Sequence, residues 1–188
     1  TMPNRGLEGL ALTPDGRHLV AAMQGPLIQD SVPQGNKRYG RYTRLVESSV
    51  DSMIPTRQFL YPLTDMTTGI SEILAITNDR FLVLERDGGK GSQAKIKAIY
   101  EIDLRGASDV LNLPVLGTTD LPNNLHVATK QLVVDLLDPA YGFSGENAIE
   151  KPEGLCWGPP AADGARTLIV CCDNDFESTM QSILHAFQ

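Results

Sequence analysis

Short apolar runs bounded by turn residues dominate this chain, and helical periodicity is nearly absent. Apolar residues rarely recur at the three- and four-residue spacing of an amphipathic helix over ten or more positions. Alternating or continuous apolar runs separated by Gly, Pro, Asn and Asp predict β-strands instead. About a dozen strands are expected, at residues 7–12, 18–23, 41–46, 57–61, 70–76, 80–84, 95–104, 131–136, 155–157, 167–172 and 182–187. The run at 131–136 also fits a short helix.

Three polar stretches between these runs predict loops. Residues 29–40 and 86–93 are rich in glycine and other turn formers, and residues 138–152 form the longest stretch. Structureless connections of this length are uncommon in compact domains unless they carry functional residues. The loops at 29–40 and 138–152 are therefore candidates for contact with a partner.

One sequence unit recurs three times along the chain. Each copy has a glutamate, a leucine two residues later, a turn with an aspartate, a basic residue and then a buried strand. The glutamates are Glu8, Glu72 and Glu153, and the aspartates are Asp15, Asp79 and Asp163. Their spacing is seven residues in the first two copies and ten in the third. Repeated units of this kind are typical of a β-propeller, in which each blade packs on its neighbours.

These patterns predict an all-β fold, a β-propeller of about three blades of antiparallel strands. Residues 1–188 would form one partial domain, because a closed ring typically has four to eight blades. We therefore expect the chain to be the C-terminal part of a larger ring. Its open sheet edges would pair with a missing N-terminal segment or with a second copy of the chain. A two-sheet sandwich is the alternative fold, but it would not explain the repeated glutamate.

Composition narrows the classes of partner. The net charge of −7 argues against a nucleic-acid partner, because phosphate contacts require clustered Lys and Arg. No apolar run approaches the length of a membrane span. The three cysteines are Cys156, Cys171 and Cys172, an odd number. One disulfide is compatible with their spacing, and three buried free thiols are the favoured interpretation.

Four segments, taken in order, resemble the motifs of a known family. Residues 4–17, 81–87, 130–136 and 153–176 are similar to consecutive motifs of the phytase-like domain family, named for the esterase-like activity of phytase. The resemblance implies a propeller, a bacterial protein exported to the periplasm or secreted, and phosphoesterase or esterase-like activity. The chain departs from the family pattern at Gln24, where relatives often carry Glu, and at Lys151, where Asn is usual.

The repeated glutamates predict a metal site. In a propeller, equivalent strand starts converge near one mouth of the central channel, where like charges repel unless a cation or an Arg joins them. Calcium binds six to eight oxygen atoms from carboxylates, amides and carbonyls. We therefore predict Glu8, Glu72, Glu153 and Asn174 as Ca²⁺ ligands. The alternative is that each glutamate caps its blade by accepting backbone N–H groups or pairing with an Arg.

Two basic residues are candidates for binding a small anionic substrate. Arg86 has the fork geometry that clamps a phosphate, and Lys130 supplies a second charge. For Arg86, the alternative is a salt bridge between blades. The chain lacks a Gly-x-Ser-x-Gly elbow and a zinc-type His or Cys pairing, so no catalytic residue is assigned. The prediction is a metal-dependent phosphoesterase or esterase-like hydrolase, and the alternative is a non-catalytic propeller that binds partners through its long loops.

Overall fold

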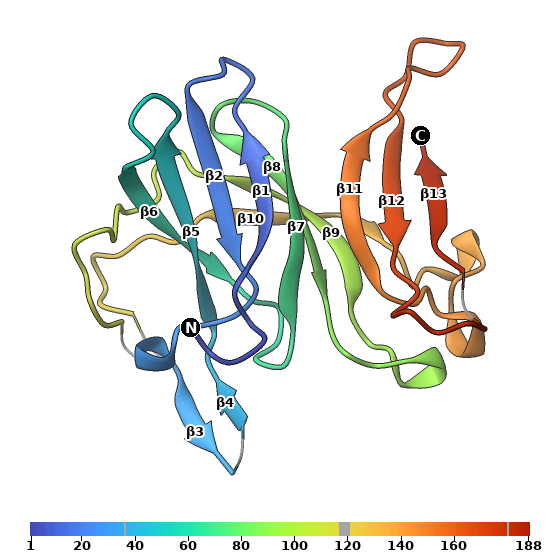
Figure 1. The fold of residues 1–188 in the computed structure, drawn as a ribbon, viewed down its shortest axis with the longest axis horizontal. Helices are drawn as coiled ribbons and strands as arrows, with labels where there is room; N and C mark the ends of the chain where they lie inside the picture. The colour runs from blue at the N-terminus through green and yellow to red at the C-terminus, as the bar shows by residue number, and fades with distance from the viewer. Residues whose placement is uncertain (36, 117–120, 180) are drawn as a thin grey trace.

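A computed structural model describes residues 1–35, 37–116, 121–179 and 181–188 (Figure 1). Within these ranges the chain is all-β, as predicted, and its helical turns are short 3₁₀ segments. None of the helices in this part of the chain has the length and apolarity of a membrane span. In the described part of the chain, the strands form four antiparallel sheets, of which three are large and one is a hairpin.

Each large sheet is a meander, in which strands that are consecutive within the sheet pair side by side. Sheet 1 contains β1 (Leu7–Leu12), β2 (His18–Met23), β5 (Tyr42–Ser49) and β6 (Pro55–Pro62). Sheet 2 contains β7 (Gly69–Ala75), β8 (Arg80–Arg86), β9 (Lys97–Asp103) and β10 (Thr129–Asp135). Sheet 3 contains β11 (Pro152–Trp157), β12 (Leu168–Cys172) and β13 (Ile183–Phe187). The run at 131–136 is thus a strand rather than a helix.

The predicted loop at 29–40 holds a hairpin. Strands β3 (Val32–Gln34) and β4 (Lys37–Tyr39) pair with each other and follow the 3₁₀ turn η1 (Ile28–Asp30). The hairpin is an insertion between β2 and β5, and it projects from the lower end of the molecule in Figure 1. The turn η2 (Gly91–Gln93) lies in the predicted loop at 86–93, and η3 (Pro139–Tyr141) and η4 (Gly145–Asn147) lie in the long connection before β11.

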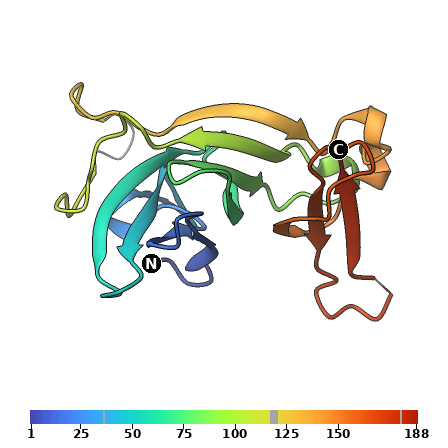
Figure 2. The same ribbon diagram turned by 90° about the horizontal axis from the view of Figure 1, so that it is seen from above.

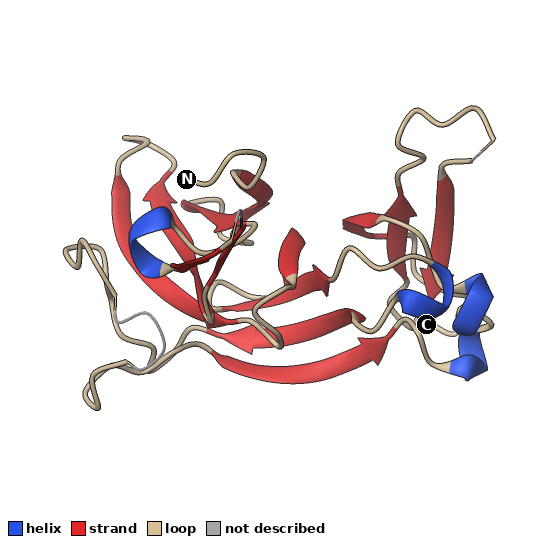
Figure 3. Cartoon of the chain, turned by 90° about the horizontal axis from the view of Figure 1, so that it is seen from below, coloured by secondary structure: helices blue, strands red, loops and turns tan. Residues whose placement is uncertain are grey.

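The three large sheets follow one another along an arc, and their first strands lie on its inner side (Figure 2). Strand β7 contacts both β1 and β11. Residues of all three strands, among them Leu10, Ile73 and Leu155, line one shared groove of about 280 Å³. Viewed from the opposite side, the 3₁₀ turns lie at the ends of the arc and the strands make up its body (Figure 3). The arrangement is not that of a two-layer sandwich.

Two apolar cores hold neighbouring sheets together. Val20, Leu45 and Phe59 of sheet 1 pack with Ile70 and Phe81 of sheet 2. On the other face of sheet 2, Leu82, Leu84 and Ile99 pack with residues of sheet 3 such as Leu155 and Val170. Burial of each such side chain contributes about 1.5–3 kcal/mol, so the contacts between sheets stabilise the arrangement of the chain.

The first two strands of each sheet share one register. A β-bulge interrupts the pairing after the first residue of β1, the second residue of β7 and the first residue of β11. Counting from the bulge, Leu10, Ile73 and Leu155 are equivalent, and each of them follows the bulge by two residues. Ile73 and Leu155 both pack against the sheet that precedes them in the chain. We call this side of a sheet its leading face, and the opposite side its trailing face.

Candidate functional site

The repeated glutamates do not all occupy the same position. The bulged residue is Glu8 in β1, Ser71 in β7 and Glu153 in β11, since each lies between the two shifted pairs of its ladder. Glu72 follows the bulge by one residue, at the position that Gly9 and Gly154 occupy in the other sheets. The expectation that the three glutamates are equivalent is therefore wrong for Glu72, while Glu8 and Glu153 do correspond.

Glu72 holds neighbouring first strands together. Its carboxylate accepts hydrogen bonds from the backbone N–H of Ile73, at 2.9 Å, and from that of Leu10 in β1. Burial raises the pKa of Glu72, and the two N–H groups oppose that shift. A Cβ at Gly9 would lie 2.7 Å from the Ile73 nitrogen, so β1 and β7 approach at a distance that only glycine allows. These contacts match the alternative interpretation of Glu72, in which the glutamate accepts backbone N–H groups instead of binding a metal.

Arg86 lies between sheets 2 and 3. It ends β8, and its Nε donates to Ser71 Oγ at 3.0 Å, while one Nη donates to the carboxylate of Glu153. Its side chain is 15% exposed, and that of Glu153 is 38% exposed. The geometry matches the alternative of a salt bridge between blades. The predicted role of Arg86 in substrate binding is not tested by these contacts, but a substrate would have to compete with Glu153.

The predicted calcium ligands are not gathered into a metal site in the part of the chain that the structure describes. That part contains no group of three or more His, Cys, Asp or Glu side chains that could hold a metal ion. Glu8 is exposed, Glu72 and Glu153 have the partners given above, and Asn174 Oδ1 accepts the backbone N–H of Phe176 at 3.2 Å. The donor set in this arrangement therefore does not fit calcium. Calcium dependence stays a prediction.

Lys130 lies in a polar cluster between sheets 1 and 2. Its Nζ donates to Glu85 Oε2 at 2.5 Å, to Thr64 Oγ1 at 2.7 Å and to the Pro62 carbonyl at 2.9 Å. The ammonium also lies 4.5 Å from the ring centre of Tyr61 and 4.0 Å from that of Tyr100. All three donors of the ammonium are thus in use, and burial lowers the pKa of Lys130.

Glu85 is the centre of that cluster. Its side chain is fully buried and also accepts hydrogen bonds from Tyr61 Oη at 2.6 Å, the Thr64 N–H at 2.7 Å and Thr68 Oγ1 at 2.5 Å. Burial, together with the charge and hydrogen bond of Glu85, raises the pKa of Tyr61 well above its ordinary value. The arrangement is that of a satisfied structural network, in which Lys130 compensates a buried charge.

A cleft with a basic lining lies beside the starts of β1 and β7. Its volume is about 760 Å³, and it lies between the N-terminal segment, strand β4 and the connection that follows β8. We call it the basic cleft. The charged residues that line it are Arg5, Lys37, Arg38, Lys95 and Asp87. Among the described residues, none of its four basic side chains forms an ion pair with a carboxylate.

The acidic member of the basic cleft is already neutralised. Lys97 Nζ donates to Asp87 Oδ1 at 2.9 Å, and the N–H groups of Gly89, Lys95 and Ile96 donate to the same carboxylate. Burial opposes ionisation of Asp87, but these hydrogen bonds outweigh it and lower its pKa. The cleft therefore presents an excess of positive charge, which attracts anions.

Hydrogen bonds fix the walls of the basic cleft. Arg38 Nε donates to Ser31 Oγ at 3.0 Å, and its Nη2 donates to the carbonyls of Ile28 and Ser31 at 3.0 and 2.8 Å, which ties the hairpin to η1. On the opposite wall, Lys97 Nζ donates to the carbonyl oxygens of Asp87 and Gly89. The exposed Lys37 and Lys95 thus project from segments whose backbone is held in place by these hydrogen bonds.

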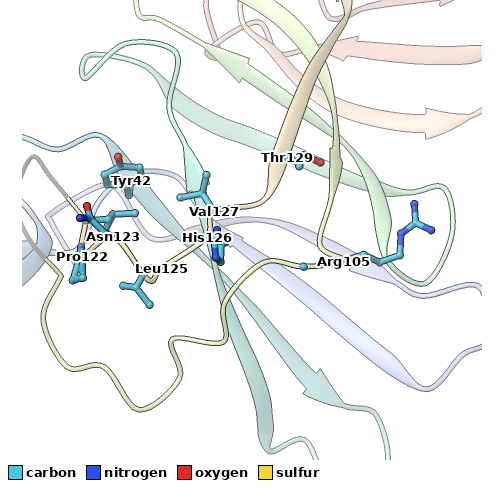
Figure 4. Close-up of a pocket in the computed structure, with 10 residues that line it drawn as sticks. Tyr42, Arg105, Pro122, Asn123, Leu125, His126, Val127 and Thr129 are labelled. Atoms are coloured by element: carbon cyan, nitrogen blue, oxygen red, sulfur yellow. The ribbon is translucent and has the colours of Figure 1, made fainter.

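A second cleft, of about 810 Å³, lies along the segment that connects β9 to β10. Figure 4 shows Tyr42, Asn123 and Leu125 grouped on one side of it and the Arg105 side chain directed away from them. Arg105 is paired with Asp103. This cleft lacks the convergent charges of the basic cleft, and it is the weaker candidate for a binding site.

Comparison with known proteins assigns the family. A family model described as phytase-like, esterase-like activity of phytase, matches residues 1–176. The chain belongs to the phytase-like family. An "Uncharacterized secreted protein" of Arthroderma benhamiae is 29% identical over an alignment of 107 residues, and the match covers 49% of this chain and 20% of that protein. No solved structure matches the chain.

Membership of the phytase-like family confirms the resemblance found in the sequence. The chain spans 20% of the length of the secreted relative, so the activity of a whole phytase-like protein is a proposal for this chain. The expectation of a bacterial source finds no support in these matches. The three cysteines are free thiols, as expected, but the expectation that all three are buried is wrong, since Cys156 and Cys171 are exposed and Cys172 alone of the three is buried.

Sequence reasoning missed the basic residues of the cleft. They come from three separate segments, and only the fold brings Arg5, Lys37 and Lys95 to one place. The available signal was weak: two adjacent basic residues, Lys37 and Arg38, in a loop already expected to carry function.

Proposed function

We propose that this phytase-like chain is part of a β-propeller that holds small anionic esters in the basic cleft and serves a phosphoesterase or esterase-like hydrolase. The propeller interpretation is supported by three sheets in meander order, by their first strands on the inner side of one arc, and by the repeated bulge. These are features that propeller blades share.

One observation carries the ligand class. Four basic side chains without carboxylate partners, among the residues described, line a cleft whose single acid is paired with Lys97. Hydrogen bonds between charged donors and an anion contribute about 1.5–3 kcal/mol each, so two or three of them give useful affinity for a phosphoester. The same charges would stabilise negative charge that develops on the ester during hydrolysis.

A non-catalytic binding function is the second candidate. The lining of the basic cleft contains neither serine nor histidine, and the Arg86–Glu153 pair occupies the space between sheets 2 and 3. Both observations favour a site that binds an anion without turning it over. Export from the cell is a further proposal, supported by the name of the secreted relative.

Phosphate binding and phosphoester hydrolysis test the proposal together. We expect inorganic phosphate to bind the wild-type chain in calorimetry, and Lys37→Ala and Lys95→Ala each to weaken binding by roughly tenfold, since each loses one charge-assisted contact. Both side chains are exposed, so the variants should fold normally. Arg17→Ala removes an exposed charge at the far end of sheet 1 and should leave binding unchanged.

Hydrolysis of p-nitrophenyl phosphate and p-nitrophenyl acetate separates the two candidates. Turnover that falls in the two lysine variants and is inhibited by phosphate supports the hydrolase. Phosphate binding without turnover of either ester supports the binding module. Unchanged phosphate binding in both lysine variants would remove the basic cleft from consideration.

A further inference from the structure

The two end sheets each leave an apolar face uncovered. On the leading face of sheet 1, Leu10 pairs with Ala21, Leu12 pairs with Leu19, and Val46 continues the row. Leu10 and Leu12 are 62% and 53% exposed. The segment around Val110 covers the outer part of this face, at Leu60 of β6 and at Arg44 of β5, which donates to the Leu113 carbonyl. The inner part, on β1 and β2, is free among the described residues.

Sheet 3 is not covered on its opposite side by any residue that the structure describes. On its trailing face Cys156 pairs with Ile169, and Ile169 with Ala186, while Cys171 pairs with Leu184. Leu184 is 68% exposed, and both Cys156 and Cys171 are exposed. The row carries no charged residue, which is unusual for a sheet face in water.

Two interfaces within the chain, between sheets 1 and 2 and between sheets 2 and 3, each join a trailing face to a leading face. The two free faces are one of each kind. Counted from the bulge, Leu10 and Leu12 correspond to Ile73 and Ala75, which pack on sheet 1. The trailing-face residues correspond in the same way to residues of sheet 2 that pack on sheet 3. These pairs are Cys156 with Leu74, Ile169 with Leu82, and Cys171 with Leu84. The free trailing face of sheet 3 therefore has the same apolar pattern as the trailing face of sheet 2, which packs against a leading face.

A glycine marks the same fit at the inner strand. Gly9 allows the backbone of Ile73 to approach β1 from the next sheet. Gly154 occupies the equivalent position in β11, and the only described atom within 4 Å of a Cβ there is the Cβ of Cys171, in its own sheet. The trailing side of β11 thus has room for the backbone of another first strand.

We propose that two copies of this chain associate head to tail and close a ring of six sheets. The leading face of sheet 1 in each copy packs on the trailing face of sheet 3 in the other. Six sheets lie within the usual range for a closed propeller, and closure covers both apolar faces at once. A second copy is the occupant because one chain carries both complementary halves. The proposal rests on the propeller arrangement but not on anion binding.

Molecular mass in solution tests the ring. Light scattering after size-exclusion chromatography should give twice the chain mass of 20.4 kDa. Leu10→Glu and Leu184→Glu should each reduce the mass to that of one chain, without loss of far-UV circular dichroism, because both side chains are exposed in the single chain. Leu132→Glu is the matched control, at 52% exposure on the outermost strand of sheet 2, and should remain a dimer.

Mixing the two variants tests the head-to-tail pairing. A Leu10→Glu chain and a Leu184→Glu chain together retain one intact interface of the two, so the mixture should recover part of the dimer. If the dimer instead joined the same face of both copies, the variant with a substitution on the other face would still form a dimer by itself. That result, or a wild-type mass of one chain at every concentration measured, would overturn the proposal. Phosphate binding is measured separately, so either proposal can fail without the other.

Discussion

Glu153 is a calcium ligand in one interpretation and the ion-pair partner of Arg86 in the other. The two interpretations predict opposite effects of a chelator on the melting temperature. If Arg86 is the partner of Glu153, Glu153→Gln should lower the free energy of unfolding by about 1 kcal/mol, since Glu153 is 38% exposed and the pair is partly screened. Chelation by EDTA should then leave the melting temperature unchanged in both proteins. Calorimetric melting with and without EDTA measures this.

The calcium hypothesis requires the reverse. EDTA would lower the melting temperature of the wild type, and Glu153→Gln would abolish that shift, because a ligand that binds only the folded state stabilises it by mass action. Glu146→Gln changes an exposed carboxylate outside the repeat and serves as the control. A melting temperature that depends on chelator would show that ligands approach one another in the presence of the ion.

At the level of the strands, the half-buried side chain of Glu72 connects β1 and β7. Burial raises the pKa of its carboxyl group. A folded-state pKa above the ordinary value of 4.5 means that the folded protein binds the proton more tightly than the unfolded chain does. The contribution of Glu72 to stability is therefore present below that value and lost as the pH rises through the folded-state pKa. Glu72→Gln keeps an acceptor oxygen for both N–H groups but does not ionise.

We expect the stability difference between Glu72→Gln and wild type to shift in favour of the variant as the pH rises from about 3.5 to 7. Urea unfolding at both pH values measures the free energies. The same measurement on Glu146→Gln corrects for general titration of the chain. A difference that does not change with pH would show that burial of the Glu72 carboxylate costs nothing in the folded state.

Strand positions were predictable from the sequence, but the register of the repeat was not. Alternation located β1 and β2 at their observed bounds. The spacing from Glu to Asp misaligned Glu72, because Asp15 is the third residue of the turn between β1 and β2, whereas Asp79 is the fourth and last residue of the turn between β7 and β8. A bulge and a change in the turn that follows it alter the apolar alternation in the same way. The sequence pattern therefore cannot locate the bulge. The hairpin β3–β4 escaped prediction because it lies outside both cores and has no buried face.

Of the candidate site, the sequence located the segment but not the roles of its residues. Glu85, Arg86 and Asp87 are adjacent in the chain, and alternation correctly places Glu85 and Arg86 on opposite faces of β8. Glu85 joins sheets 1 and 2, and Asp87 lines the basic cleft. Their partners come from residues far away in the chain, such as Lys130 and Glu153, which only the packing of whole sheets brings close.

Across the whole molecule, the cluster around Glu85 fixes sheet 1 on sheet 2. Lys130→Met should lower the free energy of unfolding by about 3 kcal/mol, because the Glu85 carboxylate stays buried without a cation. Lys90→Met, at a residue whose side chain is 53% exposed, should change it by less than about 0.5 kcal/mol. Urea unfolding followed by circular dichroism gives both values.

The double variant Glu85→Gln with Lys130→Met completes the test. Removal of both charges should restore part of the stability lost in Lys130→Met, since no uncompensated charge then remains buried. A double variant less stable than Lys130→Met would indicate that the hydrogen bonds of the Glu85 carboxylate, rather than its charge balance, dominate the cluster. A small effect of Lys130→Met alone would mean that water reaches Glu85.

The position of Glu85 also constrains the path by which the chain folds. Met23 and Cys172 stand at the equivalent positions of the other two sheets, and neither carries a charge. A sheet that docked out of order would bury Glu85 without the donor Tyr61 of sheet 1, so that a buried carboxylate would keep Lys130 but lose a hydrogen bond. We therefore expect this position to favour sheet 1 over the other sheets as the partner of the leading face of sheet 2.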